Sequence, residues 1–445
     1  MPRPDVPLTS SVPNSTGILL EPDLPICQGD LPLDRYEDAF RPYAEEYLAL
    51  PDRTPETVLP WLDRYVAPAR DHFGDSLLLL AHFYMGGEIV KLVERYGGAV
   101  SDSYVLALQA MRRPEKKVIV ESAVHFMAET VSILAAEDQS VWITNPRAGC
   151  TMEMMAKDWM VNPVAALLAE RYGDDLAVVA YMNTSGRLKA LAGRTGGAVC
   201  TSSNAHHVVQ SVRDTGRRIF FVPDEHLARN AADRIGLERV AVLPPPHLIP
   251  RDAELKDLID LPTLDRADII AWGGYCGVHT VFQVSQVQWW REAGWEVHVH
   301  PECPIDVVRA ADGAGSTNYL WKVVAEAEPG ARLAIGTEGH FVRNAAEQAS
   351  RRGVEVRHLA DIPGTPAAGC GCATMSRNDP PHLAGMLDLL RKGEAPDINR
   401  VLPGDVVDEA SGSRTRMAES DRASLVRDAA AALQRMIDIT EAAAS

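Results

Sequence analysis

Short apolar runs alternate with longer segments of helical periodicity from about residue 71 onward. The short runs are rich in branched and aromatic side chains, which is typical of strands buried in parallel sheets. They are DSLLLLAHFY, KKVIVESAV, SVWITN, LAVVAYMN, RRIFFVPD, DIIAWGG, WEVHVHPE and RLAIGTEG. Because helical patterns separate these runs, the sequence predicts an α/β protein with parallel sheets.

The two ends of the chain have different patterns. Residues 1–70 are rich in proline and acidic side chains and carry short helical patterns at 36–48 and 55–68, so they are interpreted as an N-terminal extension that wraps a core. Residues 379–445 are predicted to form a C-terminal helical segment. Its last part, 421–444, has apolar residues at helical spacing and is predicted to be a helix that closes on the core.

An internal repeat organises the middle of the chain, because EHLARNAAD at 225–233 aligns almost residue for residue with GHFVRNAAE at 339–347. In that register three units share one order: a strand with a polar end, a turn bearing a hydroxyl group, another strand, and a cysteine. The sequence therefore predicts three homologous α/β domains with short parallel sheets, arranged around a pseudo-threefold axis. Their predicted ranges are 71–155, 156–282 and 283–378.

The cysteines at the ends of the three units are Cys150, Cys276 and Cys372. Functional groups of parallel α/β units gather at the carboxyl ends of strands, so these three thiols are predicted to meet in one metal site. Three thiolates are one fewer than a structural zinc site or an ordinary [4Fe–4S] cluster needs. A [4Fe–4S] cluster held by three cysteines leaves one iron open, and that iron can bind a hydroxyl or carboxylate group.

The remaining cysteines have simpler interpretations. The start of the chain shows no charged-then-apolar leader, which predicts a cytoplasmic protein whose seven cysteines stay reduced. Cys27, Cys200 and Cys303 are interpreted as small buried side chains. Cys370, two residues before Cys372 of the CATM motif, is either a shared ligand or a spare thiol.

The formal charge of −17 excludes an extended nucleic-acid-binding surface, which needs clustered lysine and arginine. No apolar run approaches the roughly eighteen residues of a membrane span. The hydroxyl-bearing turns stand at predicted helix starts, where they either cap the helices or, together, hold anions with backbone N–H groups. Anion binding of this kind would let an acidic protein take acidic substrates.

Titratable side chains stand at or near the predicted strand ends: His82, Tyr84, Tyr181, His300 and Glu302, with His279 three residues after Cys276. Any one of them alone fits a structural role as well as a catalytic one. Their repetition at one predicted cavity favours proton transfer and stabilisation of an enolate.

These residues lie in a series of short motifs: AHFY, VSDS, HFMAE, AGC, YMNTS, CTSSNA, PDEHLARN, WGGYCGVHTVF, HPEC, GST, GTEG and CxxM. From about Leu77 to the final helix the chain resembles the quinolinate synthase family, iron–sulfur enzymes of de novo NAD biosynthesis. The resemblance implies one [4Fe–4S] cluster held by Cys150, Cys276 and Cys372. It also implies condensation of iminoaspartate with dihydroxyacetone phosphate to quinolinate, with loss of phosphate and two waters.

The resemblance implies roles for the other site residues as well. His82 and Tyr84 would serve ketose isomerisation and proton transfer, while His300 and Glu302 would be the general acid/base pair near the open iron. Binding of substrate or intermediate would fall to Ser103, Tyr181, Asn183, Ser203, His279, Ser316 and Thr317. An L-aspartate oxidase or aspartate dehydrogenase would be the upstream supplier of iminoaspartate.

The sequence departs from the family pattern at Met85, where glutamine is frequent, and at Ala373 and Ser376, where proline and lysine are frequent. These departures leave open a paralogue that makes another pyridine carboxylate from a different substrate. A non-catalytic iron–sulfur sensor is a further alternative. A sensor would not need the histidine, tyrosine and glutamate set, and it would carry a partner-binding or basic DNA-binding element that this sequence does not show.

Overall fold

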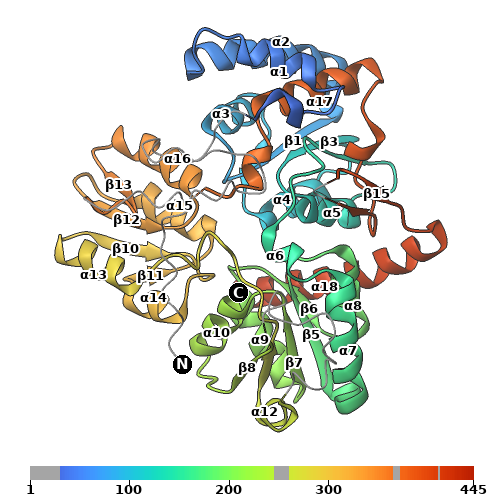
Figure 1. The fold of residues 1–445 in the computed structure, drawn as a ribbon, viewed down its shortest axis with the longest axis vertical. Helices are drawn as coiled ribbons and strands as arrows, with labels where there is room; N and C mark the ends of the chain where they lie inside the picture. The colour runs from blue at the N-terminus through green and yellow to red at the C-terminus, as the bar shows by residue number, and fades with distance from the viewer. Residues whose placement is uncertain (1–30, 245–259, 364–370, 409–410, 445) are drawn as a thin grey trace.

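Three parallel sheets form the framework of the protein. A computed structural model describes residues 31–244, 260–363, 371–408 and 411–444. Figure 1 shows the three sheets with their helices as three lobes around a common centre. This confirms the predicted α/β class with several short parallel sheets. The pseudo-threefold axis and the domain ranges stay predictions, although each sheet lies inside one predicted range.

The first strand of each unit occupies the same place in its sheet. The strand orders are β2-β1-β3-β4, β6-β5-β7-β9-β8 and β11-β10-β12-β13, and all neighbours in these sheets are parallel. The carboxyl ends of each sheet therefore lie along one edge. The strands are β1 (Leu77–His82), β2 (Ala99–Ser101), β3 (Val118–Ser122), β4 (Ser140–Ile143), β5 (Leu176–Tyr181), β6 (Ala198–Cys200), β7 (Arg218–Val222), β8 (Val240–Val242), β9 (Ile269–Ala271), β10 (Glu296–Val299), β11 (Gly313–Ala314), β12 (Arg332–Gly336) and β13 (Glu355–His358).

Every apolar run singled out in the sequence forms a strand, namely β1, β3, β4, β5, β7, β9, β10 and β12. The pattern did not predict the short strands β2, β6, β8, β11 and β13. Two further strands, β14 (Val406–Val407) and β15 (Arg414–Thr415), form an antiparallel pair. The five unpredicted strands of the parallel sheets all lie at sheet edges, where pairing with an inner strand defines them.

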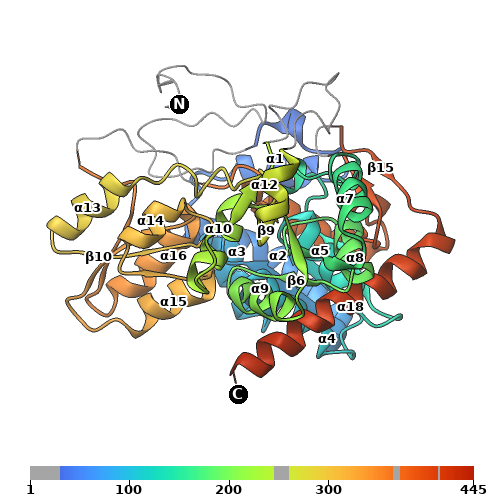
Figure 2. The ribbon, with the colours of Figure 1, turned by 90° about the horizontal axis from the view of Figure 1, so that it is seen from below.

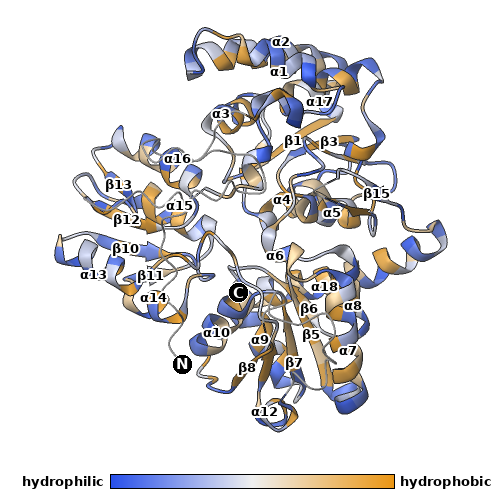
Figure 3. Ribbon diagram, in the orientation of Figure 1, coloured by the Kyte–Doolittle hydropathy of each residue, from blue (hydrophilic) through white to orange (hydrophobic). Residues whose placement is uncertain are grey.

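Helices cover the sheets and fill the ends of the chain. Figure 3 shows that they carry mixed hydrophilic and hydrophobic faces, whereas strands β1, β3, β5 and β7 are mostly hydrophobic. None of the described helices is long and apolar enough to cross a membrane. The α-helices are α1 (Arg41–Leu48), α2 (Pro55–Phe73), α3 (Gly87–Arg95), α4 (Ser103–Met111), α5 (His125–Leu134), α6 (Thr151–Met154), α7 (Asp158–Tyr172), α8 (Gly186–Arg194), α9 (Ala205–Asp214), α10 (Glu225–Arg234), α12 (Leu261–Arg266), α13 (Val284–Glu292), α14 (Ile305–Ala310), α15 (Thr317–Glu326), α16 (Gly339–Ser350), α17 (Pro380–Lys392) and α18 (Glu419–Ala444). The short 3-10 helices are η1 (Leu33–Arg35), η2 (Gly74–Ser76), η3 (Gly173–Asp175), η5 (Met375–Arg377) and η6 (Asp397–Asn399).

Strand β1 shows why the apolar runs are continuous rather than alternating. Leu77 and Leu79 pack into one apolar cluster, and Leu78 and Leu80 pack into another on the opposite face of the sheet. All four are less than 5% exposed. Burial of each such side chain contributes about 1.5–3 kcal/mol to folding. Both faces of this sheet are therefore covered, as expected for parallel strands joined by helices.

The two ends of the chain pack onto different lobes. Helices α1 and α2 pack against α17, and α18 packs against α8, β6 and α9; Figure 2 shows α18 running along the outside of the lobe that contains α8. The predicted helices 36–48, 55–68 and 421–444 therefore correspond to α1, α2 and α18. Helix α1 begins at Arg41, later than predicted, because residues 38–40 form a turn that leads into it.

A buried histidine ties the N-terminal extension to α17. His382 is fully buried, and its Nδ1 lies 2.6 Å from Oδ1 of Asp379, while Nε2 lies 3.8 Å from Oε2 of Glu37. Its ring stacks on Tyr36, with the centroids 4.9 Å apart. Burial lowers the pKa of His382, but the carboxylates of Asp379 and Glu37 outweigh that effect and raise the pKa to about 9.

We expect this histidine to make stability depend on pH. Its folded pKa exceeds the unfolded value of about 6.5, so its contribution is complete below that pH and is lost as the pH rises through about 9. His382→Gln should lower the unfolding free energy by roughly 3 kcal/mol at pH 6, and the difference from wild type should shrink toward pH 9. Denaturant unfolding across this range measures it, with exposed His72→Gln as the control; a pH-independent difference would contradict the ion pair.

Candidate active site and metal centre

One cavity lies where the carboxyl ends of strands from the three sheets meet. It has about 640 Å³ of empty space, including the part open to solvent. The described residues that line it are His82, Tyr84, Asp102, Ser103, Tyr104, Val124, Phe126, Met127, Cys150, Tyr181, Met182, Asn183, Thr201, Ser202, Cys276, Val278, His300, Glu302, Thr317, Cys372, Thr374 and Met375. The structure thus brings most of the predicted site residues to one cavity.

All three predicted metal ligands line this cavity. Cys150 caps α6 after strand β4, Cys276 follows β9, and Cys372 precedes η5. Burial is the main cause that raises the pKa of each thiol. Repulsion by Cys372 adds to it at Cys150, and repulsion by Glu302 and then by the other two cysteines adds to it at Cys276. At Cys372 the added repulsion comes from Glu338. A bound metal cation would reverse this effect by stabilising thiolates. Three free thiols gathered at one cavity therefore fit a thiolate-ligated metal group.

The other cysteines lie elsewhere or outside the description. Cys200 and Cys303 are fully buried in apolar clusters and do not line the cavity, in agreement with their interpretation as small buried side chains. Cys27 and Cys370 lie outside the described residues.

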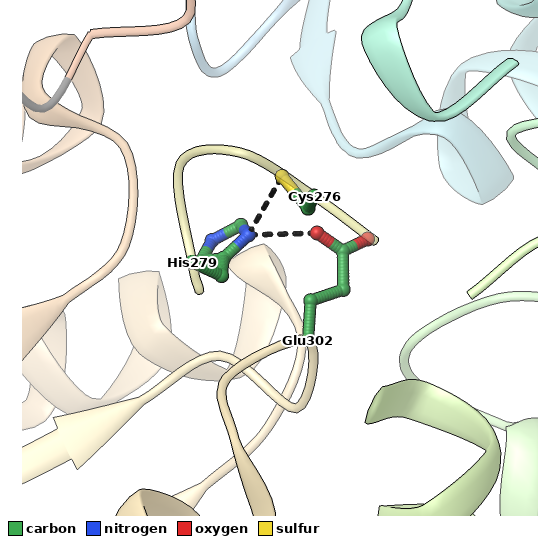
Figure 4. Close-up of side chains that lie close together, drawn as sticks. All are labelled: Cys276, His279 and Glu302. Atoms are coloured by element: carbon green, nitrogen blue, oxygen red, sulfur yellow. Dashed lines mark hydrogen bonds and ion pairs between the residues drawn. The ribbon is translucent and has the colours of Figure 1, made fainter. Parts of the chain in front are cut away.

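A compact polar cluster stands beside Cys276 (Figure 4). Nδ1 of His279 lies 3.2 Å from Sγ of Cys276 and 2.7 Å from Oε2 of Glu302. These three side chains could together hold a single metal ion, since their ligand atoms all lie within 4.8 Å of one another. The other oxygen of Glu302, Oε1, accepts a 2.5 Å hydrogen bond from the hydroxyl of Tyr181.

The charge of Glu302 follows from these contacts. Burial would raise the pKa of Glu302, but the imidazoles of His300 and His279 and the hydrogen bonds from His279 and Tyr181 hold it well below its usual range. Glu302 is therefore a carboxylate at neutral pH. Burial also raises the pKa of Tyr181 well above its usual value, so the phenol stays protonated and can donate. The ionised carboxylate and the protonated phenol thus place a proton acceptor and a proton donor in direct contact.

His82, Tyr84 and His300 complete the titratable set. Burial lowers the pKa of His82 to about 4 and that of His300 to about 3, so both imidazoles are neutral at pH 7. The Tyr84 ring meets His82 edge to face at 4.6 Å, and the His300 ring stacks on His279 at 4.4 Å. Neutral imidazoles can both donate and accept protons, which fits general acid/base chemistry.

Three helices begin at the cavity: α4 at Ser103, α9 just after Thr201 and Ser202, and α15 at Thr317. Their N-terminal N–H groups supply positive potential. None of the described lining residues is lysine or arginine. Anionic ligands would therefore depend on helix ends, hydroxyl groups and any bound metal.

Three predicted binding residues do not line the cavity, and their predicted roles are untested. Ser203 is exposed, and its hydroxyl lies 2.8 Å from that of Thr201. Ser316 is buried as the N-cap of α15 and accepts from the N–H of Tyr319. His279 contacts Cys276 and Glu302, both of which line the cavity.

Sequence reasoning missed several residues of the site. Thr337 bridges two predicted residues, since its hydroxyl lies 2.9 Å from that of Tyr84 and 3.1 Å from Nε2 of His279. Glu338 accepts from the N–H of Cys372 at 3.1 Å and so holds the backbone of that residue. Both lie in the GTEG motif, at the carboxyl end of β12. The repeated order of strand ends was the signal that could have pointed to them.

The comparison with known proteins agrees with this geometry. A family model described as "Quinolinate synthetase A protein" matches residues 69–419. The chain belongs to the quinolinate synthase family. This confirms the resemblance found in the sequence and identifies the protein as an enzyme.

Individual quinolinate synthases match most of the chain. The protein named quinolinate synthase from Geobacillus kaustophilus is 36% identical over 80% of this chain and 92% of its own length. The one from Corynebacterium glutamicum is 34% identical over 91% of this chain and 97% of its own length. The one from Streptomyces coelicolor is 36% identical over 81% of this chain and 88% of its own length.

Proposed function

We propose that this enzyme condenses iminoaspartate with dihydroxyacetone phosphate to quinolinate, with loss of phosphate and two waters. The observation that carries the proposal is a single cavity that brings together three thiols, the Tyr181–Glu302 pair and the starts of three helices. A dicarboxylate and a phosphate ester both need anion-binding groups. The condensation and dehydrations need groups that move protons.

Cys150, Cys276 and Cys372 are the residues that would hold a [4Fe–4S] cluster. Their three free thiols, drawn from three different segments of the chain, are the donor set that supports it. When bound, the cluster supplies a Lewis-acidic iron that can bind an oxygen of the substrate and assist loss of water. All five described cysteines are free, which supports the proposed cytoplasmic location.

The side chains of this chain divide the remaining tasks. Glu302 is proposed as the general base, with His300 as its partner, because the carboxylate is ionised and the imidazole neutral. His82 and Tyr84 lie together, and Tyr84 contacts the same Thr337 hydroxyl as His279. His82 and Tyr84 are both proposed to move protons of the triose phosphate. Tyr181 and Asn183 are proposed to orient the intermediate. Ser103 and Thr317, with Thr201 and Ser202, are proposed to hold its anionic groups.

Three positions depart from the family pattern, and their places in the structure support the substrates proposed above over those of a paralogue. Met85, Ala373 and Ser376 are absent from the described lining of the cavity. Met85 is buried in the apolar core, and the hydroxyl of Ser376 donates to the carbonyl of Cys372 at 3.0 Å. These positions therefore support the walls of the site without changing its chemical groups.

The direct test is an assay of anaerobically reconstituted protein. Iminoaspartate would be generated in the assay from L-aspartate by an aspartate oxidase or dehydrogenase, the proposed upstream supplier, and dihydroxyacetone phosphate would be added. We expect quinolinate and one equivalent of inorganic phosphate, with neither formed when one substrate is omitted. A protein with full iron content that makes no quinolinate, and that fails to rescue a quinolinate-requiring strain, would contradict the proposal.

A further inference from the structure

Lys189 in helix α8 is buried without an ion-pair partner. Its side chain has 0% exposure, and no described carboxylate lies within ion-pair distance of its ammonium group. The ammonium donates a hydrogen bond to the carbonyl of Thr184. Burial lowers the pKa of Lys189 to about 8, and the more distant charges of Glu129 and Glu153 oppose that effect. A buried and unpaired ammonium costs several kcal/mol of desolvation, so a reason for its presence is needed.

The fold itself does not require a lysine at this position. Strand β5 and helix α8 repeat the geometry of β1 and α3: both strands have six residues and both helices have nine, with the same spacing between them. In this register Lys189 corresponds to Val90, which is 9% exposed. An apolar side chain fills the same place in the first unit. The repeat therefore supplies an internal comparison in which this position holds an apolar side chain.

The position of Lys189 connects it to the cavity. Thr184, whose carbonyl it binds, lies in the turn between β5 and α8, and the hydroxyl of Thr184 donates to the carbonyl of Tyr181 at 2.9 Å. Tyr181 and Asn183, on either side of this turn, both line the cavity. Nζ of Lys189 also lies 5.6 Å from the ring centroid of Phe126, another lining residue. The ammonium group therefore lies behind residues that line the cavity.

We propose that Lys189 is an electrostatic positioning residue that supplies, from behind the wall of the cavity, positive charge for a carboxylate-bearing ligand. The inference rests on the proposed function. The described lining contains no lysine or arginine, and the helix N-termini supply only partial charges. A full charge at low dielectric, held behind the turn of Tyr181 and Asn183, raises the affinity for anions without forming a contact that product release must break.

The test compares binding with stability. In anaerobically reconstituted Lys189→Met, we expect the dissociation constants of quinolinate and of inorganic phosphate, measured by calorimetry, to rise at least tenfold. The KM for iminoaspartate should rise more than kcat falls, and the iron content should stay unchanged. Because the substitution removes a buried unpaired charge, the melting temperature should equal or exceed that of wild type. A purely structural lysine would instead lower the melting temperature and leave affinity unchanged.

Two further variants separate the charge of Lys189 from its hydrogen bond and from the general loss of a lysine. Lys189→Gln can still donate to the Thr184 carbonyl but carries no charge, so it should bind as weakly as Lys189→Met; wild-type affinity in this variant would overturn the proposal. Lys322→Met, at an exposed lysine paired with Glu326, should change nothing. If wild type binds no quinolinate, the proposed function fails, while the phosphate titration still tests Lys189.

Discussion

Cys372→Ser is expected to abolish the iron–sulfur cluster and all activity. Three thiols face the cavity among the described residues, and removal of one leaves two, too few to hold the cluster. A serine hydroxyl does not ionise near neutral pH and is a poor ligand for iron in such a cluster. Iron and sulfide content and visible absorption after anaerobic reconstitution measure the loss directly, together with quinolinate formation.

Cys303→Ser is the matched control for this experiment. Cys303 is more deeply buried than Cys372, lies off the cavity, and has its sulfur 3.9 Å from the carbonyl of Gly336, which can accept from a serine hydroxyl. This variant should keep its full cluster. If the two variants behave alike, the ligand assignment is wrong. A single metal ion on Cys276, His279 and Glu302 would survive the loss of Cys372, so the metal content also separates these two kinds of centre.

Glu302→Gln is expected to lower kcat by about 10²–10⁴-fold, the usual contribution of a general acid/base group. The amide keeps the shape of the side chain and can still accept from Tyr181, but it cannot take a proton. The KM values should change little, and the iron content should equal that of wild type. Steady-state kinetics and iron analysis of the same preparation provide both readouts.

Glu296→Gln is the matched control, because it also removes a carboxylate near strand β10. Glu296 starts β10, at the end opposite Glu302, and pairs with His298 at the surface. We expect wild-type kinetics from it. If Glu302→Gln instead loses metal, Glu302 is a ligand and the assignment of general base is wrong.

Much of the fold could be predicted because its strands are continuous apolar runs. A run such as Leu77–Leu80 is buried on both faces, so its hydrophobicity is visible without any knowledge of its neighbours. Edge strands such as β11, with two residues, have no such signal. They exist because a longer strand offers hydrogen bonds to them, which is a property of the assembled sheet.

The sequence predicted which types of residue form the site, but not every residue that belongs to it. The repeated order of strand end, turn and cysteine led to the three thiols, the tyrosines and Glu302, which the structure places at one cavity. The same order also selected Ser203 and Ser316, which point elsewhere because one lies exposed on its turn and the other caps its own helix. Sequence spacing predicts where a helix starts, but the direction of each hydroxyl group depends on local hydrogen bonds.

The sequence by itself determined the α/β class, the internal repeat and the family, because hydrophobic period and motif order are local properties of the chain. Only the tertiary structure decided which side chains meet. Thr337 connects Tyr84 with His279, and Glu338 binds the backbone of Cys372; both contacts join segments far apart in sequence. The burial of Lys189 without an ion-pair partner depends on what surrounds it. Their energies come from desolvation and distance, which exist only once the lobes are packed together.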